Sequence, residues 1–169
     1  MSQHQTFMRL ALAEAEKALA GNEFPVGCVI VAGNEVVARG HRANSRSETA
    51  NELDHAEIVA LRGLLAARPD IDRAGLTVYS TMEPCLMCYA TLLLNGVRTI
   101  AYGYEDAMGG GTGLDLAALT PLYREMQVEL MPGLLRAESL ALFKRFFADP
   151  ANDYWRDSLL ADYTLNQAG

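Results

Sequence analysis

Two short segments carry the side chains that could do chemistry, His55-Ala56-Glu57 and Pro84-Cys85-Leu86-Met87-Cys88. One imidazole and two thiols suit a catalytic zinc ion, which keeps three protein ligands and leaves the fourth position to water. Glu57 follows His55 by two residues, a spacing that lets its carboxylate reach that water without becoming a fourth ligand. We therefore predict one Zn²⁺ held by His55, Cys85 and Cys88, with Glu57 as the acid–base residue.

A structural zinc site is the alternative. Such sites are usually closed by four Cys or His ligands, often as two C-x-x-C knuckles. This chain has one C-x-x-C, and its third cysteine, Cys28, lies inside an apolar run that predicts a buried strand. His4 lies close to the N-terminus and His41 at a predicted strand end, and neither has a ligand-like neighbour. The sequence thus favours an open, catalytic site.

Length and composition indicate one globular domain over residues 1–169, with 50% hydrophobic and 21% charged residues. The sequence has no run of 18 apolar residues and no basic N-terminal segment before an apolar core, so we expect neither a membrane span nor a secretory signal. Three cysteines, two of them in a C-x-x-C, indicate a metal site in a reducing cytoplasm rather than disulfides. The formal charge of −7 argues against nonspecific attraction to nucleic acid.

Helices and strands are predicted to alternate along the chain. Apolar residues recur at helical spacing from 7 to 19, and further helices are predicted from near 55 to before Pro69, over 84–94 and over 134–147. Strands are predicted at 26–31, 35–39, 76–80, 97–102 and, weakly, 127–131. This order predicts an α/β fold, a three-layer α/β/α sandwich on a central mixed five-stranded sheet.

Each metal-binding segment is predicted to open a helix. Cys85 and Cys88 would then lie three apart on one helix with both sulfurs on the same side. The positive N-terminal ends of the two helices would favour thiolates over thiols. The glycine-rich stretch 109–113 predicts a mobile loop, and the aromatic residues after position 150 favour a packed tail over a disordered one.

The metal-binding segments resemble the cytidine-deaminase superfamily, and the resemblance extends from about residue 5 to residue 148. Residues 25–30, 55–58 and 83–88 look like the branch that contains tRNA adenosine deaminase, bacterial guanine deaminase and fungal cytosine deaminase. The resemblance implies hydrolytic deamination of an amidine-like ring carbon with release of ammonia.

The same resemblance implies several contacts to the substrate. In that branch, an asparagine eleven residues before the metal-binding histidine hydrogen-bonds the base, which assigns this role to Asn44. A turn asparagine satisfied by its own backbone is the alternative. Ala56 would offer backbone groups near the base, and Phe24 and Val26 would wall the pocket.

Residues 102–109 are similar to a tRNA-deaminase motif of the form G-x-R-D-A-K-T-G. Asp106 keeps the aspartate, but Glu105 and Met108 replace the two basic residues. Each lost phosphate contact weakens binding to RNA, and a glutamate in place of an arginine adds repulsion. This segment therefore points away from tRNA as the substrate.

The tail after residue 150 resembles that of fungal cytosine deaminase, which closes over the pocket. On this pattern, residues 150–169 would form a lid in which Tyr154 or Trp155 covers the pocket and Asp157 contacts the base. An ordinary surface aspartate is the alternative for Asp157. An aromatic lid suits a small enclosed ligand, because closure excludes water from the reacting atom.

We therefore expect a zinc-dependent deaminase of a small nucleobase or nucleoside, with cytosine-like and guanine-like bases first. Deamination of adenosine to inosine in tRNA is the alternative. A third possibility is a non-catalytic, zinc-containing binding module of the same fold. Glu57 argues against it, because a site without turnover needs no acid–base carboxylate. The resemblance also implies a homo-oligomer, a dimer, for which Leu92, Leu93 and Leu94 would offer an apolar surface, although a core would explain that run equally well.

Overall fold

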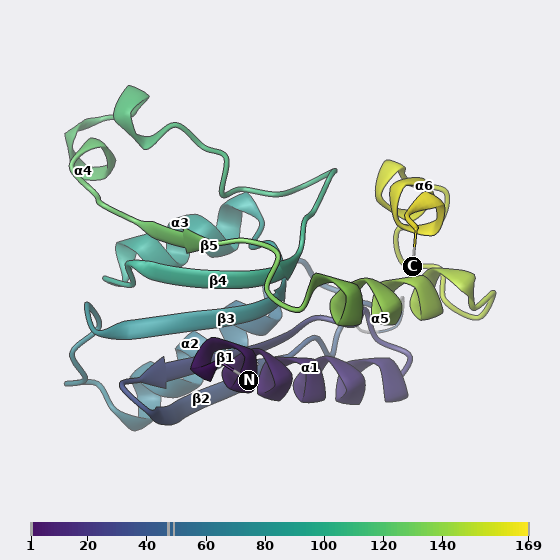
Figure 1. The fold of residues 1–169 in the computed structure, drawn as a ribbon, viewed down its shortest axis with the longest axis horizontal. Helices are drawn as coiled ribbons and strands as arrows, with labels where there is room; N and C mark the ends of the chain where they lie inside the picture. Colours follow the sequence, from purple (N-terminus) through teal and green to yellow (C-terminus); the bar gives the residue numbers. More distant parts are fainter. Residues whose placement is uncertain (1, 47, 49, 169) are drawn as a thin grey trace.

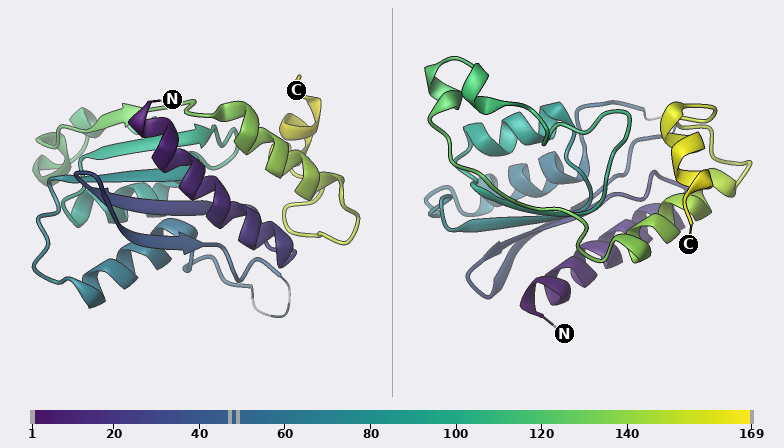
Figure 2. Two further views of the ribbon diagram at one scale, coloured as in Figure 1. Left: turned by 60° about the horizontal axis from the view of Figure 1, so that its bottom comes forward. Right: turned by 45° about the horizontal axis from the view of Figure 1, so that its top comes forward.

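The computed structural model describes residues 2–46, 48 and 50–168. A five-stranded sheet forms its middle layer, in the order β2-β1-β3-β4-β5. Helices α1 and α5 cover one face and α2 and α3 the other, as Figures 1 and 2 show. The predicted α/β fold with a mixed five-stranded sheet is confirmed. The strands are β1 (Gly27–Ala32), β2 (Glu35–His41), β3 (Leu76–Met82), β4 (Thr99–Tyr104) and β5 (Glu129–Met131). The helices are α1 (Gln3–Ala20), α2 (Ala56–Ala67), α3 (Leu86–Leu94), α4 (Pro121–Arg124), α5 (Arg136–Ala148) and α6 (Leu159–Asn166), with a 3-10 turn at Leu116–Ala118.

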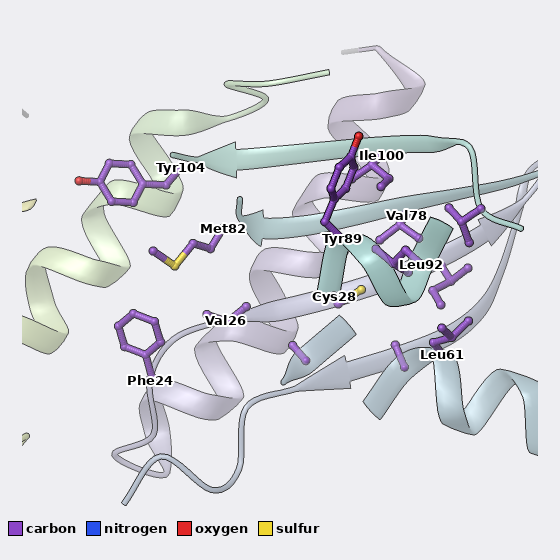
Figure 3. Close-up of a cluster of buried hydrophobic side chains, with 14 of the residues drawn as sticks. Phe24, Val26, Cys28, Leu61, Val78, Met82, Tyr89, Leu92, Ile100 and Tyr104 are labelled. Carbon is purple, nitrogen blue, oxygen red and sulfur yellow. The ribbon is translucent and has the colours of Figure 1, made fainter. Parts of the chain in front are cut away.

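Strand β1 is apolar throughout because both of its faces are buried. It pairs antiparallel with β2 and β3, while β3, β4 and β5 run parallel. Val29 and Val31 pack into the cluster that α1 covers, whereas Cys28 and Ile30 belong to the larger cluster on the other face. Figure 3 shows this larger cluster with Cys28 inside it. The prediction that Cys28 is a small core residue is therefore confirmed.

Helix α3 begins two residues later than predicted. Cys85 is its N-cap residue, with an extended backbone at φ −65° and ψ 169°. Strand β3 continues to Met82, so the chain leaves the sheet through Glu83 and Pro84 before it turns into the helix. Cys85 and Cys88 therefore do not both lie within one helix.

The loop at 109–113 is hydrogen-bonded to its surroundings, contrary to the mobile loop predicted from its glycines. The amide of Gly110 donates to the carbonyl of Asp106 at 3.0 Å, and that of Gly111 donates to the carbonyl of Pro84 at 2.9 Å. A Cβ on Gly111 would lie 2.6 Å from the backbone of Leu86. These glycines therefore allow a close approach of two backbones at the start of α3.

The tail packs on the body of the protein, as predicted. The tail contains α6, a helix that was not predicted from the sequence. On this helix Leu160 and Thr164 are buried, and the Thr164 hydroxyl hydrogen-bonds the Tyr104 hydroxyl. The Tyr154 ring lies 5.1 Å from that of Phe24. Across the described residues, we find no helix long and apolar enough to cross a membrane.

Candidate active site

Three ligand atoms meet where α2 and α3 begin. Nδ1 of His55 lies 3.5 Å from Sγ of Cys85 and 3.5 Å from Sγ of Cys88. Zinc bonds of ordinary length at a tetrahedral angle would separate such nitrogen and sulfur atoms by about 3.6 Å. Among the described residues, these three form the one group of at least three His, Cys or acidic side chains that could hold a metal, with ligand atoms within 4.8 Å of one another. The residues present therefore fit a zinc site with an open fourth position.

The two cysteines differ in their protonation. A hydrogen bond with Cys88, followed by one with His55, lowers the pKa of Cys85 to about 4 against the opposing effect of burial. The hydrogen bond with Cys85, followed by burial, raises the pKa of Cys88. Burial lowers the pKa of His55, but hydrogen bonds with Cys85 and Glu52 outweigh it and leave that pKa raised. Since zinc takes both sulfurs as thiolates, metal binding must release the Cys88 proton.

Glu57 lies in the first turn of α2 with its carboxylate buried next to the metal ligands. Its Oε1 accepts a hydrogen bond of 2.8 Å from Oγ of Ser80, and its Oε2 lies 3.5 Å from Sγ of Cys88. Burial raises the pKa of this carboxyl above its ordinary value. A raised pKa suits a group that both takes and returns a proton at neutral pH.

Glu52 supports His55 from the side opposite the cysteines. Its Oε2 lies 3.1 Å from Nε2 of His55, which orients the imidazole so that Nδ1 faces both sulfurs. The same carboxylate accepts hydrogen bonds from Arg42 at 3.1 Å and from the Tyr154 hydroxyl at 3.0 Å. Neither Glu52 nor Arg42 was predicted from the sequence as a residue of the site. One feature of the sequence could have indicated Glu52: it precedes His55 by three residues.

A cavity of about 140 Å³ opens beside these groups. It brings together most of the predicted substrate-binding residues, from four separate parts of the chain: Phe24, Val26, Ala56, Asp106, Tyr154 and Trp155. Phe24 and Val26 lie at one end of the buried cluster together with Met82, which also lines the cavity (Figure 3). Arg42, Glu52 and Glu83 line it as well, and none of the three was predicted as a site residue from the sequence.

Asn44 and Asp157 do not line this cavity. Nδ2 of Asn44 donates to Asp54 at 3.3 Å, and Oδ1 of Asn44 is buried without a hydrogen-bond partner. Asp157 is exposed, on a residue with a φ of 60°. The base contacts expected of these two residues stay predictions that this arrangement does not support.

Glu83 holds the 106–112 loop against the metal site. Its carboxylate accepts hydrogen bonds from the Asp106 amide at 3.1 Å and from the Thr112 amide at 3.2 Å. Asp106 in turn accepts from the amides of Met108 and Gly109, which closes a tight turn at the rim of the cavity. Asp106 therefore shapes this rim, and Met108 lines the cavity in place of a basic residue.

Glu105 is paired within the chain. Its carboxylate accepts hydrogen bonds from the guanidinium of Arg136, one of them 2.7 Å long, and from the Tyr163 hydroxyl at 2.8 Å. The Arg136 hydrogen bond lowers the pKa of Glu105 to about 2. Because this charge is balanced by Arg136, the repulsion of RNA that we expected from Glu105 is largely neutralised.

Fold and site together define a zinc-dependent deaminase of the hydrolase class. Residues 1–104 match the family described as the cytidine and deoxycytidylate deaminase zinc-binding region. This chain belongs to that family, which confirms the resemblance drawn from its motifs.

Relatives within the family include enzymes that act on tRNA. The tRNA-specific adenosine deaminase of Streptococcus pyogenes serotype M18 (strain MGAS8232) is 35% identical over 141 residues, which cover 83% of this chain and 87% of the relative. That of Bacillus subtilis (strain 168) is 32% identical over 149 residues, covering 88% and 91%.

Solved structures agree with this fold. One, from work on A-to-I editing by tRNA:A34 deaminases, superposes with a TM-score of 0.69 at 31% identity, over 81% of this chain and 98% of that chain. Guanine deaminase from Nitrosomonas europaea gives a TM-score of 0.69 at 19% identity, over 86% and 85%. At that identity, the second likeness supports the fold alone.

Proposed function

We propose that this chain hydrolytically deaminates a small nucleobase or nucleoside. The observation that carries the proposal is the cavity of about 140 Å³ that His55, Cys85 and Glu57 line together with the aromatic side chains of the tail. In the reaction, a water oxygen bonds to a ring carbon, the bond from that carbon to the exocyclic amine breaks, and ammonia leaves.

Glu57 moves the protons. When bound by His55, Cys85 and Cys88, zinc supplies the Lewis acidity that activates the attacking water. Glu57 accepts one proton of that water and delivers it to the ring nitrogen; it then takes the remaining proton from the oxygen that has added to the ring carbon and passes it to the departing amine, so that the carbonyl forms as ammonia leaves. Ser80 fixes one oxygen of this carboxylate, so the other remains directed toward the metal ligands.

The aromatic tail favours a small substrate. The Tyr154 hydroxyl hydrogen-bonds Glu52, and the Trp155 ring lies 5.6 Å from that of Tyr154. Both rings line the cavity, so they would exclude water around one enclosed ring. An extended RNA loop would need these rings to move away from the mouth.

Adenosine in tRNA is the second candidate. The identity of 35% with a tRNA-specific adenosine deaminase, spread over 83% of this chain, favours it. These relatives support tRNA more directly than they support a small substrate. The pairing of Glu105 with Arg136 also removes part of the electrostatic argument against RNA.

One experiment separates the two candidates. Ammonia release would be measured from free bases, nucleosides and nucleotides, and inosine formation would be measured in tRNA with the same zinc-loaded protein. Turnover of a free base or nucleoside without inosine in tRNA is the expected result. Inosine in tRNA with no turnover of any small compound would establish the second candidate and overturn the first.

We also propose that this chain forms a dimer. Leu92 and Leu93 are buried in the core, but Leu94 is 55% exposed. On or beside α2 and α3, Val59 and Leu86 are exposed as well, which leaves apolar surface on this layer. Light scattering over a concentration series should show a dimer, and Leu94→Glu should weaken it. A monomer at every concentration would contradict this inference.

A further inference from the structure

Arg42 is a buried cation beside the reacting groups. It follows β2 directly, and its side chain is 2% exposed. Long charged side chains are almost never fully buried unless they are paired. The salt-bridge partner of Arg42 is Glu52, whose own side chain is 58% exposed.

The hydrogen bonds of Arg42 use only part of its donor capacity. Nη2 donates to the carbonyl of Asn51 at 2.9 Å and to Glu52 at 3.1 Å. Nε is buried and has no hydrogen-bond partner. A guanidinium has five N–H donors and no acceptor, so any cavity ligand that hydrogen-bonds Arg42 must bring an acceptor atom.

The cavity places Arg42 among several carboxylate acceptors. The acidic side chains that line the cavity are Glu52, Glu57, Glu83 and Asp106. Arg42 is the one arginine or lysine among the described residues that line it. Carboxylates attract the amine and the ring N–H of a base, whereas a guanidinium binds a carbonyl oxygen, as arginine does at the edge of guanine.

We propose that Arg42 binds a ring carbonyl of the substrate, which makes the substrate an amino heterocycle that also carries an oxo group. The inference rests on the proposed function and narrows it to cytosine-like and guanine-like rings. Arg42 would hold the oxo edge of the ring while the amine faces Glu57. Adenine-type rings have no carbonyl and would leave the guanidinium incompletely paired.

A purely structural role for Arg42 makes a different prediction. In that case, Arg42 would only tie Glu52 and the Asn51 carbonyl to the tail through the Tyr154 hydroxyl, 3.4 Å away. Removing it would lower stability or zinc content and would affect all substrates alike. Binding of an oxo group requires an effect that depends on that one atom of the ligand.

The test uses two pairs of compounds that differ by one oxo group: cytosine with 4-aminopyrimidine, and guanine with 2-aminopurine. The ratio of kcat/KM within each pair would be measured for the native chain and for Arg42→Met. Comparing the ratios between proteins cancels the intrinsic reactivity of each compound, as in a double-mutant cycle. Arg46→Met is the matched control, because Arg46 lies in the same loop, is 52% exposed and does not line the cavity.

We expect the preference for the oxo member of at least one pair to fall about 10- to 100-fold in Arg42→Met, the range for a hydrogen bond to a charged group. Arg46→Met should keep the native ratio. Arg42→Lys, which retains the charge next to Glu52, should keep the fold and recover part of the preference, and thermal unfolding and zinc content would be measured for each variant. Equal ratios in native and Arg42→Met proteins would overturn the inference.

Failure of the proposed function is distinguishable from failure of this inference. If none of the four compounds is deaminated, the proposed function fails for free bases, and calorimetric binding of the same four compounds then tests Arg42. Tighter binding of the oxo member, lost in Arg42→Met, would support the inference. Binding that ignores the oxo group, or no binding of any of the four, would overturn it.

Discussion

The hydroxyl of Ser80 donates a 2.8 Å hydrogen bond to Oε1 of Glu57. Both side chains are buried, and they come from β3 and α2, which are 23 residues apart at these positions. The bond leaves Oε2 of Glu57 as the oxygen next to Cys88. It therefore sets which oxygen of the carboxylate faces the metal ligands.

Glu57→Gln should abolish most of the activity while zinc stays bound. The amide keeps the shape of the carboxylate but cannot take a proton, so kcat should fall by about 10²- to 10⁴-fold. Activity would be measured together with zinc content, and exposed Glu16→Gln serves as the control. Full activity in a zinc-loaded Glu57→Gln or Glu57→Ala protein would refute the mechanism and leave a metal-binding module as the better reading.

Ser80→Ala should lower kcat about tenfold with little change in zinc content, because it frees the Glu57 carboxylate to rotate. Ser139→Ala is a close control, since Ser139 is also fully buried but its hydroxyl has no hydrogen-bond partner. The control should keep native kcat. If both variants behaved alike, the orienting role of Ser80 would be excluded.

Gly111→Ala should weaken zinc binding. A Cβ at this position would lie 2.6 Å from the Leu86 backbone and 2.8 Å from that of Cys85, so either the loop or the cysteine segment must shift. Changes around metal ligands typically cost 10- to 100-fold in affinity. Competition with a chelator would measure it. Gly113→Ala is the matched control, because a Cβ there would meet nothing within 4 Å; equal zinc affinity in the two variants would contradict this account.

Trp155→Ala should raise KM for a small substrate about tenfold, because it opens the cover of the cavity. Leu122→Ala, which removes a side chain that is 61% exposed and does not line the cavity, should have no effect. Inosine formation in tRNA would be measured in parallel. Unchanged KM for the small substrate, with faster reaction of tRNA, would mean that Trp155 obstructs the true substrate.

Glu105→Gln should destabilise the protein near neutral pH and have less effect in acid. The Arg136 hydrogen bond lowers the pKa of Glu105 from 4.5 to about 2, so the folded chain keeps this carboxylate ionised where the unfolded chain protonates it. The resulting stability is fully present above about pH 4.5 and is lost as the pH falls toward about 2. Both partners are about one-third exposed, so solvent screening keeps the effect modest.

Urea unfolding of the native and Glu105→Gln proteins across that pH range would measure the effect. Their difference in unfolding free energy should shrink as the pH falls. The exposed Glu125→Gln variant should show no such trend. A difference that is independent of pH would exclude the ion pair as its source.

The sequence by itself determined the metal site and the reaction class. His55 and Glu57 lie two residues apart and Cys85 and Cys88 three apart, so local backbone geometry brings each pair to one side almost independently of the rest of the chain. Periodicity likewise determined the sheet, because the apolar run of β1 reflects burial on both of its faces. The starts of α3, β4 and α5 were each placed two residues early, and α4 and α6 were not predicted. At α3 the reason is that the crossing from β3 at Glu83 and Pro84 depends on contacts with the 106–112 loop.

Tertiary structure decided which polar side chains line the cavity. Counting eleven residues back from His55 selected Asn44, yet the path of the loop after β2 turns Arg42 into the cavity and leaves Asn44 outside its lining. The partners of Glu105 lie 31 and 58 residues away, so no local pattern could show that its charge is balanced. Local spacing encodes groups that act within one turn of a helix. The surroundings of the cavity depend on how distant loops, the sheet and the tail pack against one another. Local spacing in the sequence therefore could not predict them.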